Sequence, residues 1–149
     1  MNIALLAHDK KKELMTQFCD AYCGILKNHD LCAPYTTGKL VSNATGMTVK
    51  LLLTCADGGY QQIGQRIVHN EVDLVLFFCD PSSQKITKDI DTISRLCDLY
   101  TIPMATNVAT AEVLIQGLMH GDLDWRNIVN SYKKKQPRLI RKKQKSKVS

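Results

Sequence analysis

The sequence predicts an α/β protein: a three-layer α/β/α sandwich around a five-stranded, mainly parallel sheet. Short apolar runs of strand length alternate along the chain with segments that carry apolar residues at helical spacing. Parallel strands require crossover helices, so this alternation is typical of a parallel sheet covered on both faces. The length of 149 residues is that of one domain with a proper core, and no internal repeat is visible.

The first part of the chain opens the alternation. Asn2 to Ala7 is a short apolar run and predicts a buried strand. Lys10 to Leu26 has its apolar residues at helical spacing and predicts a helix. Leu31 to Tyr35 predicts a short strand, which Pro34 ends, and Thr37 to Ala44 predicts a short helix.

The rest of the chain repeats the alternation of strand-like and helix-like segments, with clearer boundaries between them. Val49 to Thr54 predicts a strand, and Leu74 to Cys79 is the clearest core strand. Helices are expected over Gln61–Val68, Ile90–Tyr100 and Ala109–Met119, with a strand over Ile102–Thr106 and a helix-stopping glycine at position 121. The expected architecture is Rossmann- or flavodoxin-like, so ligands should bind beyond the carboxyl ends of the strands.

The charge of the chain is unevenly distributed. The net charge is +6, yet residues 133–149 hold nine Lys and Arg and no acidic residue, which leaves 20 − 9 = 11 basic against 14 acidic residues, or −3, for the rest. We therefore divide the chain into a domain over 1–132 and a basic tail over 133–149 that is expected to be disordered. The tail could serve solubility, or it could contact RNA, an anionic membrane or an acidic face of a neighbouring subunit.

Cysteine and histidine spacing gives no metal or disulfide signature. The six cysteines form no CxxC pair and several lie in apolar periodic segments, where a free thiol behaves as a small hydrophobe. The four histidines are dispersed, so we expect no metal site. The apolar runs are too short to span a bilayer, and the basic residues follow the N-terminal apolar patch instead of preceding it, so we expect no membrane association and a cytoplasmic location.

The expected strand ends carry polar or conformationally free residues: His8, Asp9 and Lys12 after the first strand, Thr36 and Thr37 after the second, Gly58 and Gly59 after the third, and Asp80 after the fourth. Hydroxyls, a lysine and helix starts suit a small phosphorylated ligand. Each signal also has a purely structural interpretation, because threonines cap helices and Asp-Gly is a common turn pair.

At these residues the chain resembles methylglyoxal synthase. The matching pieces are IALLAHDKKK, TTGKLVSNATGM, GGYQQIG, DLVLFFCDP, RLCDLYTIPMATNVATAE and GDLDWRNIV, in family order over about residues 2–129. The resemblance implies a parallel α/β sandwich, usually a homohexamer, that converts dihydroxyacetone phosphate to methylglyoxal and inorganic phosphate without a metal or organic cofactor. The same domain type also serves as a regulatory ligand-binding module in carbamoyl phosphate synthetase, and it occurs in a purine-biosynthetic enzyme.

The resemblance also implies roles for individual residues. His8 corresponds to the histidine that contacts the substrate oxygens, and Lys12 to the lysine that holds the phosphate. The phosphate-binding group would further comprise Thr36, Thr37, Thr54, Gly58 and Gly59, and the site carboxylates would be Asp9, Asp80 and Asp89. The match of Asp89 requires that one residue is missing from the loop after Pro81.

The departures from the family pattern lie in the site. Pro34 and Tyr35 replace a Thr-Gly pair of the phosphate loop, and Cys55 replaces a glycine. The loop PSSQKITK lacks the family's catalytic histidine, and Tyr60 stands where the family has its catalytic aspartate. A tyrosine has a pKa of about 10, so forming the phenolate at pH 7 costs roughly 4 kcal/mol, which makes Tyr60 a poor substitute for a carboxylate base.

Three functional hypotheses follow. The first is a methylglyoxal synthase-like enzyme, slow or inactive, in which Asp57, Asp9, Asp80 or Asp89 takes over as base or in which the reaction differs. The second is a module of the same fold that binds phosphate or a phosphorylated metabolite without catalysis. The third, a nucleic-acid binder, rests only on the basic tail, because the domain lacks interleaved basic and aromatic residues.

Overall fold

The computed structural model describes residues 1–83 and 87–128. Five strands form one sheet in the order β3-β2-β1-β4-β5, and every neighbouring pair is parallel. The strands are β1 (Asn2–Ala7), β2 (Asp30–Pro34), β3 (Val49–Leu52), β4 (Leu74–Phe78) and β5 (Met104–Ala105). The predicted α/β class and strand count are confirmed. The predicted tail over 133–149, and with it the domain boundary at 132, lies outside the described residues.

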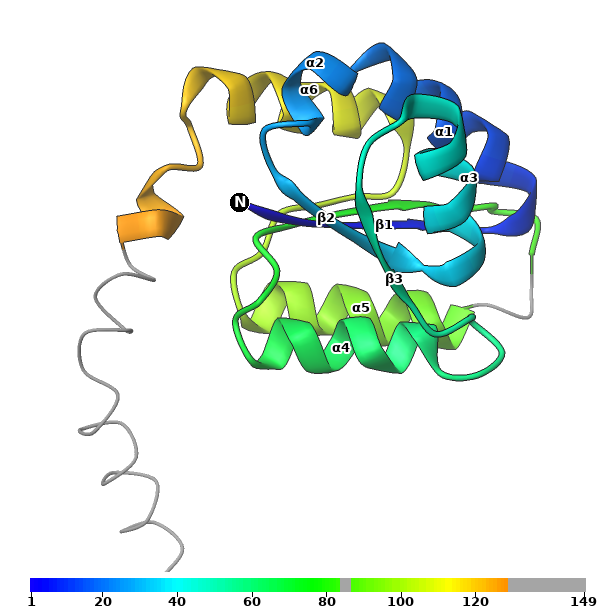
Figure 1. The fold of residues 1–149 in the computed structure, drawn as a ribbon. Helices are drawn as coiled ribbons and strands as arrows, with labels where there is room; N and C mark the ends of the chain where they lie inside the picture. Colours follow the sequence, from blue (N-terminus) through cyan, green and yellow to red (C-terminus); the bar gives the residue numbers. More distant parts are fainter. Residues whose placement is uncertain (84–86, 129–149) are drawn as a thin grey trace, which may run out of the picture.

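Helices cover both faces of the sheet (Figure 1). One face carries α1 (Lys12–Ala21), α2 (Cys23–Leu26), α3 (Tyr35–Thr45) and α6 (Val108–His120), and the other carries α4 (Gly59–Val68) and α5 (Thr87–Leu99). A 3-10 turn, η1 (Asp9–Lys11), links β1 to α1. The predicted three layers are therefore present.

Several predicted elements differ in extent. Helix α5 begins at Thr87 instead of Ile90, α4 begins at Gly59 instead of Gln61, and β3 ends at Leu52 instead of Thr54. The single helix expected over Lys10–Leu26 is wrong: η1 precedes it and Tyr22, with φ −103° and ψ 19°, interrupts it between α1 and α2. Helix α3 begins at Tyr35, two residues earlier than predicted, because Pro34 with φ −53° already occupies the N-cap position. Strand β5 is only two residues long, since Pro103 before it has no N–H to donate to a ladder.

The apolar side chains form a separate core on each side of the sheet. Alternate residues of β1 point to opposite faces, as the strand pleat requires: Ile3 and Leu5 pack with α1, α3 and α6, whereas Ala4 and Leu6 pack with α4 and α5. Strand β4 is buried along its whole length. This two-sided burial explains why its sequence is continuously apolar instead of alternating.

Local caps and turns agree with the sequence signals. The side chain of Asn107 caps α6 by accepting from the Thr110 N–H at 3.1 Å, and Gly121 ends that helix with φ 83°. All six cysteines are free. In the described ranges, 1–83 and 87–128, no helix is long and apolar enough to cross a membrane and no cluster of His, Cys, Asp or Glu could hold a metal ion.

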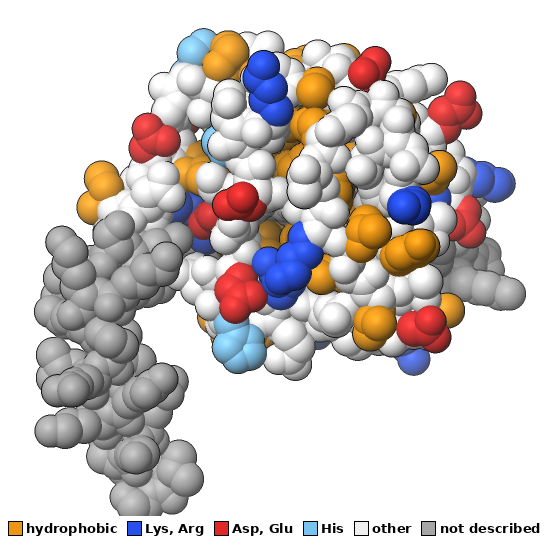
Figure 2. Space-filling view, in the orientation of Figure 1, with side chains coloured by type: hydrophobic (Ala, Val, Ile, Leu, Met, Phe, Trp, Pro, Cys, Tyr) orange, Lys and Arg blue, Asp and Glu red, His pale blue; other side chains and the backbone are white. Residues whose placement is uncertain are grey.

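Strand β3 is an open edge of the sheet. The Leu53 N–H just beyond it is engaged by the side-chain oxygen of Gln62, at 2.6 Å, so α4 covers this end of the edge. Leu51 and Leu53 are nevertheless exposed, as is Leu40 of α3. Figure 2 shows apolar side chains gathered on the right-hand part of this face, between scattered charges.

A buried ion pair ties the end of the described chain to the amino edge of the sheet. The Arg126 Nε donates to Asp73 Oδ1 at 3.3 Å, and both side chains are almost fully buried. The second Asp73 oxygen accepts from the Asn2 N–H at 2.9 Å, and the Arg126 guanidinium also donates to the Thr101 carbonyl. These contacts join four segments that are distant in sequence.

We predict that Arg126→Ala destabilises the protein by about 3–5 kcal/mol, because it removes the counter-charge of the buried Asp73 carboxylate. The matched control is Arg95→Ala, which truncates an exposed arginine of α5 and should change stability by less than about 0.5 kcal/mol. Urea unfolding of the two variants measures the difference. Equal losses of stability in the two variants would show that the Arg126–Asp73 ion pair does not stabilise the fold.

Candidate active site

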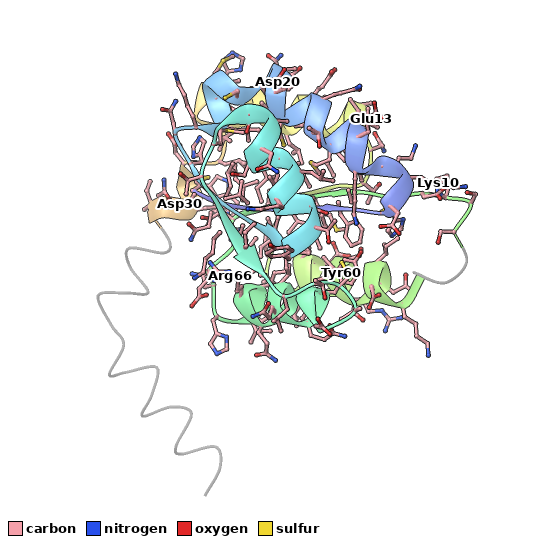
Figure 3. All side chains as sticks on the ribbon, turned by 45° about the vertical axis from the view of Figure 1, so that its right-hand side comes forward. Lys10, Glu13, Asp20, Asp30, Tyr60 and Arg66 are labelled. Atoms are coloured by element: carbon pink, nitrogen blue, oxygen red, sulfur yellow. The ribbon has the colours of Figure 1, made fainter. Side chains whose placement is uncertain are left out.

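The residues singled out from the sequence lie at the carboxyl edge of the sheet, which we call the rim: the segments that follow β1, β2, β3 and β4 and the first turns of α3, α4 and α5. Figure 3 shows Lys10, in the η1 turn before α1, and Tyr60, at the start of α4, toward the same end of the molecule. His8, Asp9, Asp80 and Asp89 lie close enough for each carboxylate to raise the pKa of His8 against the opposing effect of burial. The structure thus brings together side chains from four separate segments.

His8 is a buried, neutral hydrogen-bond donor. It follows β1 and is only 3% exposed, and its backbone N–H donates to the Phe78 carbonyl at 3.1 Å. Its Nδ1 accepts from the Asp80 N–H at 2.7 Å, which requires that the neutral ring carries its proton on Nε2. Burial lowers the pKa of His8 below 6.5. Within residues 1–83 and 87–128 the buried Nε2 has no partner, so its N–H is available to a ligand oxygen.

Lys12 and Asp9 form an ion pair at the start of α1. The Lys12 Nζ lies 2.7 Å from Asp9 Oδ1, and this contact lowers the pKa of the Asp9 carboxyl. The Lys12 side chain is 18% exposed while that of Asp9 is 95% exposed. A bound anion would therefore meet a largely buried ammonium whose present partner can turn into solvent.

Thr36 and Thr37 occupy the first turn of α3. The hypothesis that they cap this helix is wrong, since Pro34 holds the N-cap position and no side chain caps the helix. Thr37 is buried and Thr36 is exposed. Their backbone N–H groups lie in the first turn of the helix, where no carbonyl of the same helix can accept from them. Free N–H groups with hydroxyls beside them are suited to bind an anion.

A tight turn connects β3 to α4. The Thr54 hydroxyl donates to Asp57 Oδ2 at 2.9 Å, and the Gly59 N–H donates to the Thr54 carbonyl at 2.8 Å. Gly58 has φ 112°, and a Cβ on Gly59 would lie 2.3 Å from the Leu53 carbonyl oxygen. The glycines are required by this close approach, and Asp57 has the turn role that its Asp-Gly sequence indicates.

Tyr60, in the first turn of α4, has its side chain packed in the hydrophobic layer beneath the rim. It is 9% exposed, and its ring stacks on Phe77 with centroids 5.5 Å apart and 10° between the planes. Burial, the Cys55 thiol and the Asp89 and Asp9 carboxylates, in that order of importance, raise the pKa of its hydroxyl well above 10. The side chain is a protonated phenol at neutral pH.

The two further carboxylates differ in their surroundings. Asp80 Oδ1 accepts from the Ser82 N–H at 3.0 Å and from its hydroxyl at 2.7 Å, which forms a turn and lowers the pKa of Asp80. Asp89 lies in the first turn of α5, half-buried, and lines a groove between α4 and α5 together with Tyr60. No hydrogen bond or ion pair engages Asp89 within the part of the chain that the structure describes.

Comparison with known proteins places this arrangement in a family. The model of the MGS-like domain matches residues 15–106. Methylglyoxal synthase of Caldicellulosiruptor saccharolyticus is 54% identical over 131 residues, covering 87% of this chain and 93% of the relative. Methylglyoxal synthase of Geobacillus thermodenitrificans is 51% identical over 131 residues, covering 87% and 91%.

The chain belongs to the methylglyoxal synthase family. The crystal structure of methylglyoxal synthase from Elizabethkingia anophelis NUHP1 superimposes with a TM-score of 0.70 at 37% identity and covers 76% of each chain. The family and the fold predicted from the sequence are thereby confirmed, and this chain is a methylglyoxal synthase-like protein. Both of these relatives are named methylglyoxal synthase, which is a lyase activity.

Two contacts of the rim were not predicted from the sequence. Phe77 contacts both His8, edge-on at 5.3 Å, and Tyr60, by stacking. The Asp80 backbone N–H, not its carboxylate, fixes the His8 tautomer. No signal marked Phe77, because every residue of β4 is apolar, whereas the placement of Asp80 at a strand end adjacent to that of His8 could have suggested the second contact.

We predict that Gly59→Ala destabilises the methylglyoxal synthase-like domain by more than about 2 kcal/mol, since backbone must move to admit a Cβ 2.3 Å from the Leu53 oxygen. Gly24→Ala is the matched control: it adds the same methyl group on helix α2, where no atom lies within 4 Å, and should be neutral or stabilising by up to about 1 kcal/mol. Thermal unfolding compares the two. A Gly59→Ala variant as stable as Gly24→Ala would contradict the close approach.

We also predict a pH effect from His8. Its folded-state pKa is lowered, so the unfolded chain binds the proton more readily. Stability should be full above pH 6.5 and should fall as the pH drops below that value toward the folded-state pKa. The dependence should be weaker in His8→Gln, whose amide oxygen can still accept from Asp80. Denaturant titrations at several pH values test this, and an unchanged pH dependence in the variant would exclude His8 as its source.

Proposed function

We propose that this protein binds dihydroxyacetone phosphate at the rim and converts it to methylglyoxal and inorganic phosphate at a rate limited by the lack of a carboxylate at position 60. The observation that supports it most is His8: a buried imidazole held in one tautomer, with a donor N–H that no described residue uses. A neutral imidazole of this kind can polarise a carbonyl and stabilise the enediolate that forms from it.

The phosphate group would bind between Lys12 and the first turn of α3. Lys12 supplies a positive charge close to His8 in the chain, and Thr36 and Thr37 supply N–H groups and hydroxyls. Thr54, which the resemblance places in the phosphate-binding group, already donates its hydroxyl to Asp57 and would have to exchange that partner. The glycine pair lets α4 begin close to the same region.

The proposed reaction needs a base for one carbon-bound proton. The base takes the proton next to the carbonyl, the C–H electron pair forms the enediolate, and the carbon–oxygen bond to phosphate then breaks with its electrons leaving on phosphate. The remaining enol takes up a proton on carbon and becomes methylglyoxal. No oxidant, reductant or organic cofactor enters this balance.

Tyr60 is unsuited to that step, and we assign it to Asp89. The phenol of Tyr60 is buried, stacked and protonated. The contacts with Lys12 and Ser82 lower the pKa of Asp9 and Asp80 and make these carboxylates weaker bases. The Asp57 carboxylate is engaged in the turn by the Thr54 hydroxyl. Asp89 is half-buried, lies beside Tyr60 in the same groove and has no described partner.

We predict that Tyr60→Asp raises turnover of dihydroxyacetone phosphate by about 10²–10⁴-fold, the usual contribution of a positioned general base. Methylglyoxal and phosphate release are measured together for purified full-length protein. Tyr60→Phe is the control, and it should leave the low rate unchanged because the hydroxyl has no role. A wild-type rate equal to that of Tyr60→Asp would show that Tyr60 does not limit catalysis.

Asp89→Asn should abolish the residual rate of the wild-type protein while leaving phosphate binding intact. Binding is followed as thermal stabilisation by millimolar phosphate, which Lys12→Met should remove. If phosphate stabilises the wild-type protein but no variant gains activity, the binding-module hypothesis replaces the enzyme. If phosphate has no effect at all, the rim is not an anion site.

A further inference from the structure

A cavity of about 530 Å³ lies at the opposite edge of the sheet from the rim, where β1, β2 and β3 begin. Its walls come from four places in the chain: the segment between α2 and β2, the segment before β3, the start of β1 and the last turns of α4. Figure 3 shows Asp30 and Arg66 at this end, away from Tyr60. The volume is in the range of small-molecule sites.

Basic side chains converge on this cavity. Lys27, Lys50 and Arg66 line it against one acidic residue, Asp30, and His29 also contributes. Outside the tail the chain has 11 basic and 14 acidic residues and is therefore negatively charged overall. The three cations around this cavity make it locally positive instead. Concentrated positive charge in a concave site attracts anions.

Arg66 gives the cavity an unsatisfied donor. Its Nε is buried and has no hydrogen-bond partner in residues 1–83 and 87–128. Its terminal Nη1 lies 3.5 Å from a Glu71 oxygen, a long contact to a half-exposed carboxylate. A buried donor left unpaired is costly, and an oxygen-rich anion is the partner that a guanidinium fork binds best.

The remaining lining is apolar. Leu26, Leu31 and Met47 form part of the wall, and Leu31 and Leu26 belong to the core on the α1–α3 face. Leu31 and Met47 keep 5% and 7% of their surface exposed, and a bare phosphate ion would leave that surface in contact with water. A ligand with an apolar body attached to the anionic group would cover it.

We propose that this cavity is a second anion site, distinct from the rim, which takes a small phosphate monoester with its phosphate among Arg66, Lys50 and Lys27 and its apolar body against Leu31 and Met47. The site does not depend on the proposed function of the rim, since the two share no residue. Helix α4 runs between them, with Tyr60 at its start and Arg66 near its end.

The test uses the isotope-labelled full chain and two probes, phenyl phosphate and inorganic phosphate, followed by amide NMR shifts. We expect phenyl phosphate to shift the amides of Met47, Thr48 and Lys50, and to bind there about tenfold more tightly than inorganic phosphate. Amides of Thr36 and Thr37 report the rim in the same spectra. Lys12→Met should remove the rim shifts and leave those of the cavity.

Matched variants test whether binding depends on the residues of the cavity or only on the net charge of the protein. Lys50→Gln should weaken phenyl phosphate binding at the cavity by at least about threefold, whereas Lys39→Gln, which removes an exposed lysine of α3 outside the cavity, should not. Arg66→Lys keeps the charge but removes the fork and should also weaken binding. Shifts confined to the rim, or equal affinities for Lys50→Gln and Lys39→Gln, would overturn the proposal.

Discussion

The hydrogen bond between the Asp80 N–H and His8 Nδ1 is the contact on which the rim depends. It joins the ends of two neighbouring parallel strands, β1 and β4, and the backbone contact from His8 to Phe78 reinforces the same junction. A backbone N–H can only donate, so Nδ1 of His8 must accept and the neutral ring must carry its proton on Nε2. Main-chain geometry, which the sheet fixes, thereby determines which ring nitrogen carries the proton.

Phe77 connects that histidine to Tyr60. The same aromatic ring meets His8 at its edge and Tyr60 at its face. An aspartate at position 60 would lie beside an apolar ring, where burial of its carboxylate is unfavourable. A tyrosine instead gains contact area by stacking on Phe77. The tyrosine at position 60 therefore adds packing contacts to the core on the α4–α5 face of the sheet.

Much of this architecture follows from the sequence, for reasons that particular elements make clear. Strand β4 and helix α6 have unambiguous apolar patterns and caps, and both lie within one residue of their predicted bounds. The start of α3 was missed because a proline is compatible with both a strand end and a helix N-cap. The Arg126–Asp73 pair left no signal, since neither the spacing nor the composition of residues 121–128 indicates what a lone arginine contacts across the fold. Which carboxylate is unpaired at the rim also depends on turn geometry, which residue types alone do not determine.

The anchoring of Arg126 has a practical consequence for anyone handling the protein. The described chain ends two residues later, at the edge of the sheet where Asn2 also lies, and the rim is at the other end of the strands. Attachment to a chip or a rigid fusion partner through the N-terminus, next to Asn2, would leave the rim pointing into solution. Labels placed near position 128 would in turn lie on the side of the sheet where the second cavity opens.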